Sequence, residues 1–198
     1  MKFVLASQNE HKLQEMQAIL AAQGVEVVLE RDIGLHVEVE ETGSTFGENA
    51  LLKAKAVMEK SGLPAIADDS GICVDALNGA PGVYSARYGG EELDDVQRYR
   101  LLLEMLRGQT NRAAHFTSHI TCCFPNGDII DAEGTCPGTI AFAPQGTGGF
   151  GYDPVFFVPQ LRKTYAQLTP EEKAAVSHRG KALAEFEEKL KAYLAAQK

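Results

Sequence analysis

The chain has 198 residues, of which 44% are hydrophobic and 23% charged, so it can bury a core and is expected to form one domain, 1–198. Its net charge of -8 argues against a nucleic-acid polymer as partner, because a phosphate backbone is met by dense Lys and Arg. Only the short apolar run 3–6 precedes polar residues at the N-terminus, which is too little for a signal peptide or a membrane span. A cytoplasmic protein without a membrane partner is therefore expected.

The cysteines show neither Cys-x-x-Cys spacing nor the paired histidines of a zinc site. They are Cys73, Cys122, Cys123 and Cys136. We expect them to be reduced. Cys122 and Cys123 are neighbours, so in a strand they would point to opposite faces.

Hydrophobic periodicity predicts an α/β fold around a sheet of mixed direction, in which strands and helices alternate first and a hairpin follows. Strands are expected at residues 2–6, 25–29, 64–67, 72–74, 115–124, 128–133, 139–142 and 155–158. Helices are expected between the polar turn 7–9 and Gly24, over 46–60 and 95–107, from Thr169, and over 177–196. Pro125-Asn126-Gly127 predicts the turn of the hairpin.

Two of these helices have a definite expected apolar face. The helix over 46–60 begins with the capping box Thr45-x-x-Glu48, has Gly62 near its end and presents Leu51, Leu52, Ala56 and Val57. The helix over 95–107 carries the apolar cluster Leu101, Leu102, Met105 and Leu106.

Two neighbouring aspartates lie where Asp68-Asp69-Ser70-Gly71 is expected to interrupt a strand. A buried carboxylate is unfavourable unless its charge is matched, and a divalent cation would match it. Carboxylate oxygens favour Mg²⁺, which takes one or two protein carboxylates plus phosphate and water. Glu41, in the acidic loop after the second strand, is the expected second ligand. The alternative is that Asp68 or Asp69 caps a turn through Ser70 and Gly71.

The pattern Ser7-x-Asn9-x-x-Lys12 lies where a strand gives way to a helix N-terminus. Backbone N–H groups and the positive end of the helix dipole meet at such a point and bind phosphate readily. Lys12 would add a full charge one turn inside the helix. The alternative is that Ser7 or Asn9 is a helix cap and Lys12 a solvated surface lysine.

The segment from Gly146 to Pro154 joins a glycine-rich backbone to two aromatics and a carboxylate. Glycines let a backbone lie flat against a ligand. Phe150 and Tyr152 offer faces on which a purine base would stack, and Asp153 offers acceptor oxygens. The alternative is an ordinary turn between strands.

The last helix begins with Ser177-His178-Arg179-Gly180. Arg179 is a rigid donor fork suited to a keto oxygen or a phosphate. A single histidine such as His178 is more often structural than catalytic, and a helix lysine such as Lys53 usually only contacts solvent. Taken together, a phosphate cradle, a carboxylate metal site, a stacking loop and a cation that reads a keto group describe a nucleoside triphosphate enzyme.

The motifs also carry a resemblance to a known family. They are Ser7-x-Asn9-x-x-Lys12, Glu41-Thr42-Gly43-x-Thr45-Phe46-x-Glu48-Asn49-Ala50, Ala67-Asp68-Asp69-Ser70-Gly71, the segment Gly79 to Arg87, the segment Gly146 to Pro154, and Ser177-His178-Arg179-Gly180. With them the chain closely resembles, from end to end, the inosine/xanthosine triphosphate pyrophosphatases, which remove deaminated purine nucleotides. The resemblance implies hydrolysis of ITP, dITP and XTP to monophosphate and pyrophosphate, by a Mg²⁺-assisted attack of water at the α-phosphorus. It also implies a two-lobed α/β fold with an elongated sheet, and a homodimer.

Carried over by position, the resemblance implies that Asp69 is the proton acceptor and that Glu41 and Asp69 bind Mg²⁺. It further implies a set of nucleotide-binding residues. These are Ser7, Gln8, Asn9, Glu10, His11 and Lys12 at the triphosphate, and Lys53, Ser70, Phe150, Gly151, Tyr152, Asp153, Lys173, His178 and Arg179. Tyr152 stands where eukaryotic relatives tend to have Trp, so the chain looks bacterial.

Two other interpretations stay open. A septum-formation-inhibitor-like nucleotide pyrophosphatase has a similar architecture and a different base specificity, but its basic Ser-Pro-Arg-type opening is absent after Ala6. A non-catalytic purine nucleotide sensor would bind with the same residues without turnover.

Overall fold

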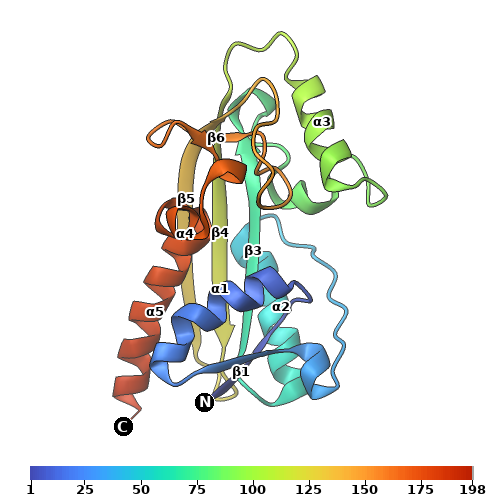
Figure 1. Ribbon diagram of the computed structural model, residues 1–198. Coiled ribbons are helices and arrows are strands. Elements are labelled where there is room, and N and C mark those ends of the chain that lie inside the picture. Colours follow the sequence, from blue (N-terminus) through green and yellow to red (C-terminus); the bar gives the residue numbers. More distant parts are fainter. Residues whose placement is uncertain (198) are drawn as a thin grey trace. The chain divides into compact units, whose positions relative to one another are not determined.

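The computed structural model describes residues 1–197 and confirms the predicted α/β class with a mixed sheet (Figure 1). The seven strands follow the order β2-β1-β3-β4-β5-β6-β7. They are β1 (Lys2–Leu5), β2 (Glu26–Leu29), β3 (Ala65–Val74), β4 (Ala113–Cys123), β5 (Ile129–Ile140), β6 (Phe156–Val158) and β7 (Lys163–Thr164). The α-helices are α1 (Glu10–Leu20), α2 (Phe46–Ser61), α3 (Asp95–Met105), α4 (Pro170–Val176) and α5 (His178–Ala196).

The chain divides into two compact units, and β3, β4 and β5 contribute residues to both. The first unit comprises Met1–Asp69, Ser118–Gly134 and the chain from Lys181 onward, and the second comprises Ser70–Thr117 and Thr135–Gly180. In the first unit β1 runs parallel to β2 and to β3. In the second unit β6 runs antiparallel to β5 and β7.

The core of the first unit has two layers, because neighbouring side chains in a strand point to opposite faces. One layer joins Phe3 and Ile120 of the sheet to Met16 of α1 and Phe186 of α5. The other joins further sheet residues to α2, and its members include Val4, Ala50, Ala54, Val57 and Ala67. Helices α1 and α5 therefore cover one face of this part of the sheet and α2 covers the other (Figure 1).

The core of the second unit is rich in aromatic rings. Phe116 of β4 contacts Phe156 of β6 edge-on, with ring centroids 4.8 Å apart, and stacks on Tyr165. Leu102 and Leu106 bring α3 into the same core, and both are fully buried. Aromatic contacts of this kind add to the free energy gained from burying the rings.

Strand β3 runs without interruption through the segment 68–71, so the predicted break is wrong. The polar residues Asp68 and Asp69 are both buried there. Strand propensity disfavours Asp, but contacts made in the folded state override it. Those contacts come from lysines on two helices, described below.

Strand β5 is also continuous, where two strands at 128–133 and 139–142 were predicted. Gly138 lies inside it, at a place where a side chain would not fit. A Cβ there would lie 2.6 Å from the backbone oxygen of Phe157 in β6. The glycine is therefore a site of close strand approach rather than a strand end.

Helix α2 has the predicted capping box at Thr45, and it ends at Gly62 in the left-handed region, with φ 67°. Its buried face is rotated from the predicted one, because Asn49, Ala50, Ala54 and Val57 are buried. Leu51 and Leu52 are 36% and 38% exposed. In α3, Leu102 and Leu106 are buried as predicted, whereas Met105 is 51% exposed.

The corrected face of α2 can be tested with two single substitutions. Val57→Ala removes two methyl groups from a fully packed layer and should lower the free energy of unfolding by about 2 kcal/mol. Leu52→Ala removes a larger group from the exposed face and should cost well under about 1 kcal/mol. Chemical denaturation of both variants checks this, and an equal or larger loss in Leu52→Ala would contradict the assignment.

Candidate functional site

The predicted site residues fall into two groups, one in each unit. The carboxylate cluster of the first unit contains Lys12, Glu41, Lys53, Asp68 and Asp69. The loop cluster of the second unit contains Ser70, Phe150, Asp153, Lys173 and Arg179. Each is described by itself below.

The N-terminus of α1 is capped by the residues predicted to hold phosphate. Asn9 is the N-cap, and its Oδ1 accepts hydrogen bonds from the backbone N–H groups of His11 and Lys12, at 2.9 and 3.2 Å. Ser7 Oγ accepts from the Asn9 N–H at 3.1 Å. Glu10 forms an ion pair with Arg31. The capping role that was the alternative for Asn9 is thus present.

Lys12 is directed to Asp68 rather than to open solvent. Its Nζ lies 2.9 Å from Asp68 Oδ2, and its side chain is only 16% exposed. The other carboxylate oxygen of Asp68 accepts a hydrogen bond from Ser118 Oγ at 2.6 Å. Because Asp68 is fully buried, this pairing is what makes its charge tolerable in the core.

The loop that carries Glu41 is held tightly against the first turn of α2. Gly43 N–H donates to Asn49 Oδ1 at 2.8 Å, and the Ser44 N–H and hydroxyl both donate to Glu48, at 2.7 and 2.8 Å. A Cβ on Gly43 would lie 2.6 Å from Asn49 Oδ1, so a larger residue would push the loop away. These contacts fix where the Glu41 carboxylate can reach.

Lys53, further along α2, lies between two carboxylates. Its Nζ is 2.8 Å from Glu41 Oε1 and 2.8 Å from Asp69 Oδ1. Burial lowers the pKa of Lys53, but Asp69 and Glu41 outweigh burial and the pKa is raised overall. The pKa of Asp69 is raised overall, because burial and the nearby Glu41 carboxylate outweigh the lowering by the Lys53 and Lys12 cations.

The donor set of the carboxylate cluster fits a hard cation. Asp69 Oδ2 is buried and has no hydrogen-bond partner among residues 1–197, and a bound cation would satisfy it. The structure contains, over the same residues, no group of three or more His, Cys, Asp or Glu that could hold a metal. One or two carboxylates completed by phosphate and water are nevertheless the usual protein contribution to a Mg²⁺ site. Glu41 and Asp69 meet that requirement.

Asp153 is the centre of the glycine-rich loop. It is 4% exposed, and its Oδ2 accepts hydrogen bonds from the Phe150 N–H at 3.0 Å and from Lys173 Nζ at 2.6 Å. Gly149 has φ +74°, and a Cβ there would lie 1.9 Å from Asp153 Oδ2. The glycine is required so that the loop can wrap around the carboxylate.

Burial raises the pKa of Asp153, and the Lys173 ammonium acts in the opposite direction. Lys173 Nζ also lies 5.1 Å from the centre of the Phe150 ring and 5.4 Å from that of Tyr165. Lys173 is therefore packed among acceptors and rings. It is not a solvated helix lysine.

The start of α5 brings Arg179 to Ser70. Arg179 is 4% exposed, and its Nη2 donates to Ser70 Oγ at 3.3 Å. A Cβ on Gly180 would lie 1.9 Å from the Ala174 backbone oxygen, so only glycine allows α5 to start this close to α4. His178 is buried, and its ring stacks on Phe116 with centroids 4.6 Å apart.

The two aromatics of the loop have different environments. Phe150 is 38% exposed, whereas Tyr152 is 5% exposed and belongs to the core of the second unit. The Tyr152 hydroxyl donates to the Ser85 backbone oxygen at 2.8 Å. Tyr152 therefore packs in the core of the second unit and Phe150 is the more exposed ring of the loop, while stacking of a purine on either ring stays a prediction.

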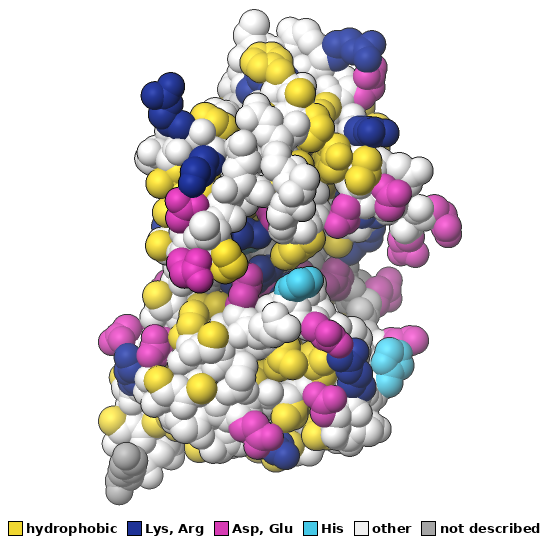
Figure 2. Space-filling view, viewed as in Figure 1, with side chains coloured by type: hydrophobic (Ala, Val, Ile, Leu, Met, Phe, Trp, Pro, Cys, Tyr) yellow, Lys and Arg dark blue, Asp and Glu magenta, His cyan; other side chains and the backbone are white. Residues whose placement is uncertain are grey.

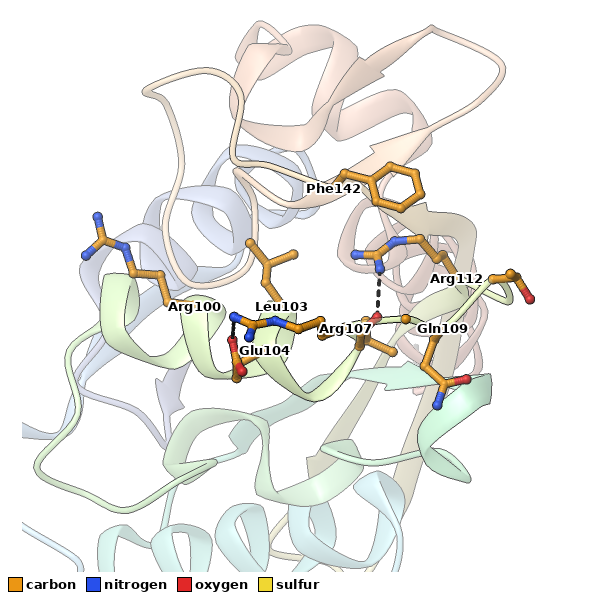
Figure 3. Close-up of a pocket in the computed structure, with 10 residues that line it drawn as sticks. Arg100, Leu103, Glu104, Arg107, Gln109, Arg112 and Phe142 are labelled. Carbon is orange, nitrogen blue, oxygen red and sulfur yellow. Dashed lines mark hydrogen bonds and ion pairs between the residues drawn. The ribbon is translucent and has the colours of Figure 1, made fainter.

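A hollow of about 690 Å³ elsewhere in the second unit contains none of the predicted site residues (Figure 3). Phe142, 83% exposed, and Arg112 form one side of it. The Arg112 guanidinium lies 4.4 Å from the Phe142 ring centre and donates to the backbone oxygens of Ile140, Ala141 and Leu106. Arg112 thus links the end of β5 to the C-terminal end of α3.

The face drawn in Figure 2 shows no single basic region among the described residues. On the face visible in Figure 2, Lys and Arg side chains are scattered among Asp and Glu. Along residues 1–197 no helix has both the length and the apolar character needed to cross a bilayer. All four cysteines are free thiols, as predicted.

Two buried polar residues, one bonded to the loop that carries Glu41 and one bonded to Asp68, were not singled out from the sequence as site residues. Asn49 lies in the motif from Glu41 to Ala50. Its Oδ1 accepts a hydrogen bond from the Gly43 N–H, which anchors the loop that carries Glu41. Ser118 lies in a strand outside every motif. Only its place among the alternating apolar residues Phe116, Ile120 and Cys122 distinguishes it, and that is a weak signal.

The comparisons with known proteins agree on one family. A family model described as the Ham1 family matches residues 3–189. A relative named dITP/XTP pyrophosphatase from Exiguobacterium sp. is 49% identical over 187 residues, which cover 94% of this chain and 95% of the relative. A relative of the same name from Haemophilus influenzae is 51% identical over 193 residues, covering 96% and 98%.

Solved structures give the same result. The structure of a HAM1 protein from Coxiella burnetii matches with a TM-score of 0.91 and 42% identity, covering 97% of this chain and 99% of that one. The Staphylococcus aureus Ham1 protein matches with a TM-score of 0.88 and 41% identity over the whole of both chains.

Removal of the Lys173 cation should make stability depend on pH. In Lys173→Met the buried Asp153 carboxylate loses its cation, so its pKa rises further and the free energy of unfolding at pH 7 falls by about 3 kcal/mol. The deficit relative to wild type should shrink as the pH falls below the raised pKa, because the folded state then holds a neutral carboxyl. Thermal denaturation at pH 5 and pH 7 measures this.

Lys163→Met is the matched control, because Lys163 pairs with Glu172 in the same unit with both side chains about 40% exposed. It should leave the free energy of unfolding nearly unchanged at either pH. A deficit in Lys173→Met that stays constant between pH 5 and pH 7 would contradict the role given to Asp153.

Proposed function

This chain belongs to the Ham1 family, and we propose that it hydrolyses the non-standard purine nucleoside triphosphates ITP, dITP and XTP to the monophosphate and pyrophosphate. Relatives about half identical to it over nearly their whole length carry the name dITP/XTP pyrophosphatase. Hydrolysis would remove these deaminated purine triphosphates from the pool of nucleotides used for nucleic-acid synthesis.

The observation that carries the proposal is the arrangement of charges in the carboxylate cluster. The ammonium groups of Lys12 and Lys53 donate to one oxygen, the backbone carbonyl of Asp68, at 3.1 and 3.4 Å. Two cations that converge in this way suit the dense negative charge of a triphosphate. Asp69 lies within the same cluster and supplies a base. Binding of phosphate and activation of water thus have their groups in one unit.

Asp69 is the proposed proton acceptor. Its Oδ1 is held by Lys53, and its carboxylate would accept the proton of a water that attacks the α-phosphorus. Lys12 and Lys53 would stabilise the charge that builds up on the departing pyrophosphate. We propose that Glu41 and Asp69 hold Mg²⁺, which when bound supplies charge neutralisation on the triphosphate and a lower pKa for water.

The loop cluster is proposed to select the base. Phe150 would stack on any purine, so selection falls to polar groups. Hypoxanthine and xanthine carry a 6-keto acceptor where adenine carries an amino donor. A buried donor such as Arg179 would be left unpaired by ATP, and such a mismatch is worth ~10⁴-fold in kcat/KM. The other residues that were predicted to bind the nucleotide are proposed to do so as well.

Pyrophosphate release from ITP, XTP, GTP, ATP and dTTP, each with and without Mg²⁺, tests the proposed function. Release that is restricted to ITP and XTP and requires Mg²⁺ is expected. Preference for a pyrimidine nucleotide would favour the septum-formation-inhibitor-like activity instead. Absence of release from every nucleotide, together with binding, would leave a sensor.

Asp69→Asn tests the base. The amide keeps the size of the side chain but cannot accept the proton, so kcat should fall by about 10²-fold or more, with nucleotide binding retained in part. Steady-state kinetics with ITP and binding by calorimetry measure the two effects. A kcat close to that of wild type would remove Asp69 from this role.

Arg179→Ala tests base selection. The ratio of kcat/KM for ITP to that for ATP should narrow by about tenfold or more, since the unpaired donor no longer penalises adenine. Arg100→Ala, at an arginine on the hollow of Figure 3, is the control and should leave the ratio unchanged. An unaltered ratio in Arg179→Ala would show that another group recognises the 6-keto oxygen.

The assembly and location of the protein also remain proposals. We propose that residues 1–198 act as one catalytic domain, that two copies form a homodimer, and that the enzyme works in the cytoplasm without a nucleic-acid or membrane partner. Light scattering after size-exclusion chromatography would measure the mass directly. A mass near 21.4 kDa at working concentration would exclude the dimer.

A further inference from the structure

Ser118 is a buried hydroxyl for which neither the fold nor the proposed reaction accounts directly. It lies in β4 and is fully buried, two positions before Ile120 of the hydrophobic core of the first unit. Its Oγ donates to Asp68 Oδ1 at 2.6 Å. That distance is typical of a charge-assisted hydrogen bond to an ionised carboxylate, which is stronger than a neutral one.

The Asp68 carboxylate that receives this bond also determines the direction of Lys12. Asp68 Oδ2 lies 2.9 Å from Lys12 Nζ, and the Asp68 backbone oxygen lies 3.1 Å from it. Lys12 is on α1 and Asp68 on β3, so the ion pair places the end of a flexible side chain at a defined point. A lysine otherwise retains many rotamers, which would spread its charge over a large volume.

The rotation of the Asp68 carboxylate about its own bond helps to determine where Lys12 is held, together with the Asp68 backbone oxygen. Two hydrogen-bonding contacts, one on each oxygen, fix that rotation, and Ser118 makes one of them. Without the hydroxyl, Oδ1 would be a buried anionic oxygen that has lost a donor, and the carboxylate would turn to compensate. The Lys12 ammonium would follow it.

We propose that Ser118 is a positioning residue of the carboxylate cluster, which fixes the Asp68 carboxylate and through it aims the Lys12 ammonium at the phosphates of the substrate. This role rests on the proposed function, because it assumes that Lys12 binds phosphate. It extends the functional part of the chain to β4, which holds none of the motifs.

Another hydroxyl on the same strand provides a matched control. Thr121 is fully buried, and its Oγ1 donates to Asp131 Oδ1, also at 2.6 Å. Asp131 is not part of the carboxylate cluster. Ser118→Ala and Thr121→Val therefore each delete one hydroxyl-to-carboxylate hydrogen bond from β4, and they differ in which carboxylate loses its donor.

The experiment compares ITP hydrolysis and binding of inorganic triphosphate in the wild type and these two variants, with thermal denaturation as a measure of folding. Ser118→Ala is expected to lower kcat/KM about tenfold and to weaken triphosphate binding by a similar factor. Thr121→Val should leave both unchanged. Ser118→Thr, which keeps a hydroxyl, should restore both towards wild type.

Each outcome bears on the proposal. Equal effects of Ser118→Ala and Thr121→Val would show a loss of stability only and would overturn it, as would unchanged kinetics and binding in Ser118→Ala. A wild-type protein that binds triphosphate but does not hydrolyse ITP would refute the proposed function alone, since the binding comparison would still test Ser118. Weaker binding confined to Ser118→Ala would then support the positioning role without any activity.

Discussion

The alternation of side chains in β3 governs the arrangement of charge in the first unit. Because the strand continues through Asp68 and Asp69, the two carboxylates leave it on opposite faces. Asp68 meets Lys12 from α1, and Asp69 meets Lys53 from α2. A turn at this point would have let the carboxylates approach each other, and like charges at short range resist ionisation together. The strand instead gives each carboxylate its own helix and its own cation.

The buried carboxylate of the second unit is also paired with a lysine, but it lies in a loop rather than in a strand. Asp153 is surrounded by a backbone N–H and an ammonium group, and Gly149 is present because any side chain there would collide with the carboxylate. Asp68, Asp69 and Asp153 are therefore each paired with a lysine from a helix. Such pairs add little net stability, but loss of one partner is costly, so both units hold their charged groups in narrowly defined positions.

Local signals in the sequence predicted a large part of the fold. The capping box at Thr45 and the stop at Gly62 depend on residues a few positions apart, and both were found. The cation that accommodates buried Asp68 inside β3 comes from Lys12, which is 56 positions away, and no local pattern contains that information. Helical periodicity identified α2 but not which side faces the sheet. The motifs predicted the site residues. The burial of Tyr152, in contrast, results from tertiary packing, which the motifs do not contain.

The oxygen shared by Lys12 and Lys53 belongs to the main chain. Every amino acid at position 68 would present the same carbonyl, so this part of the cation-binding arrangement is encoded by the strand and not by a side chain. Single substitutions at position 68 would leave this carbonyl in place. A mutational scan would therefore underestimate the contribution of the backbone oxygen to holding the two ammonium groups together. Side chains around this point can therefore change while the shared backbone oxygen remains, provided that β3 keeps its conformation.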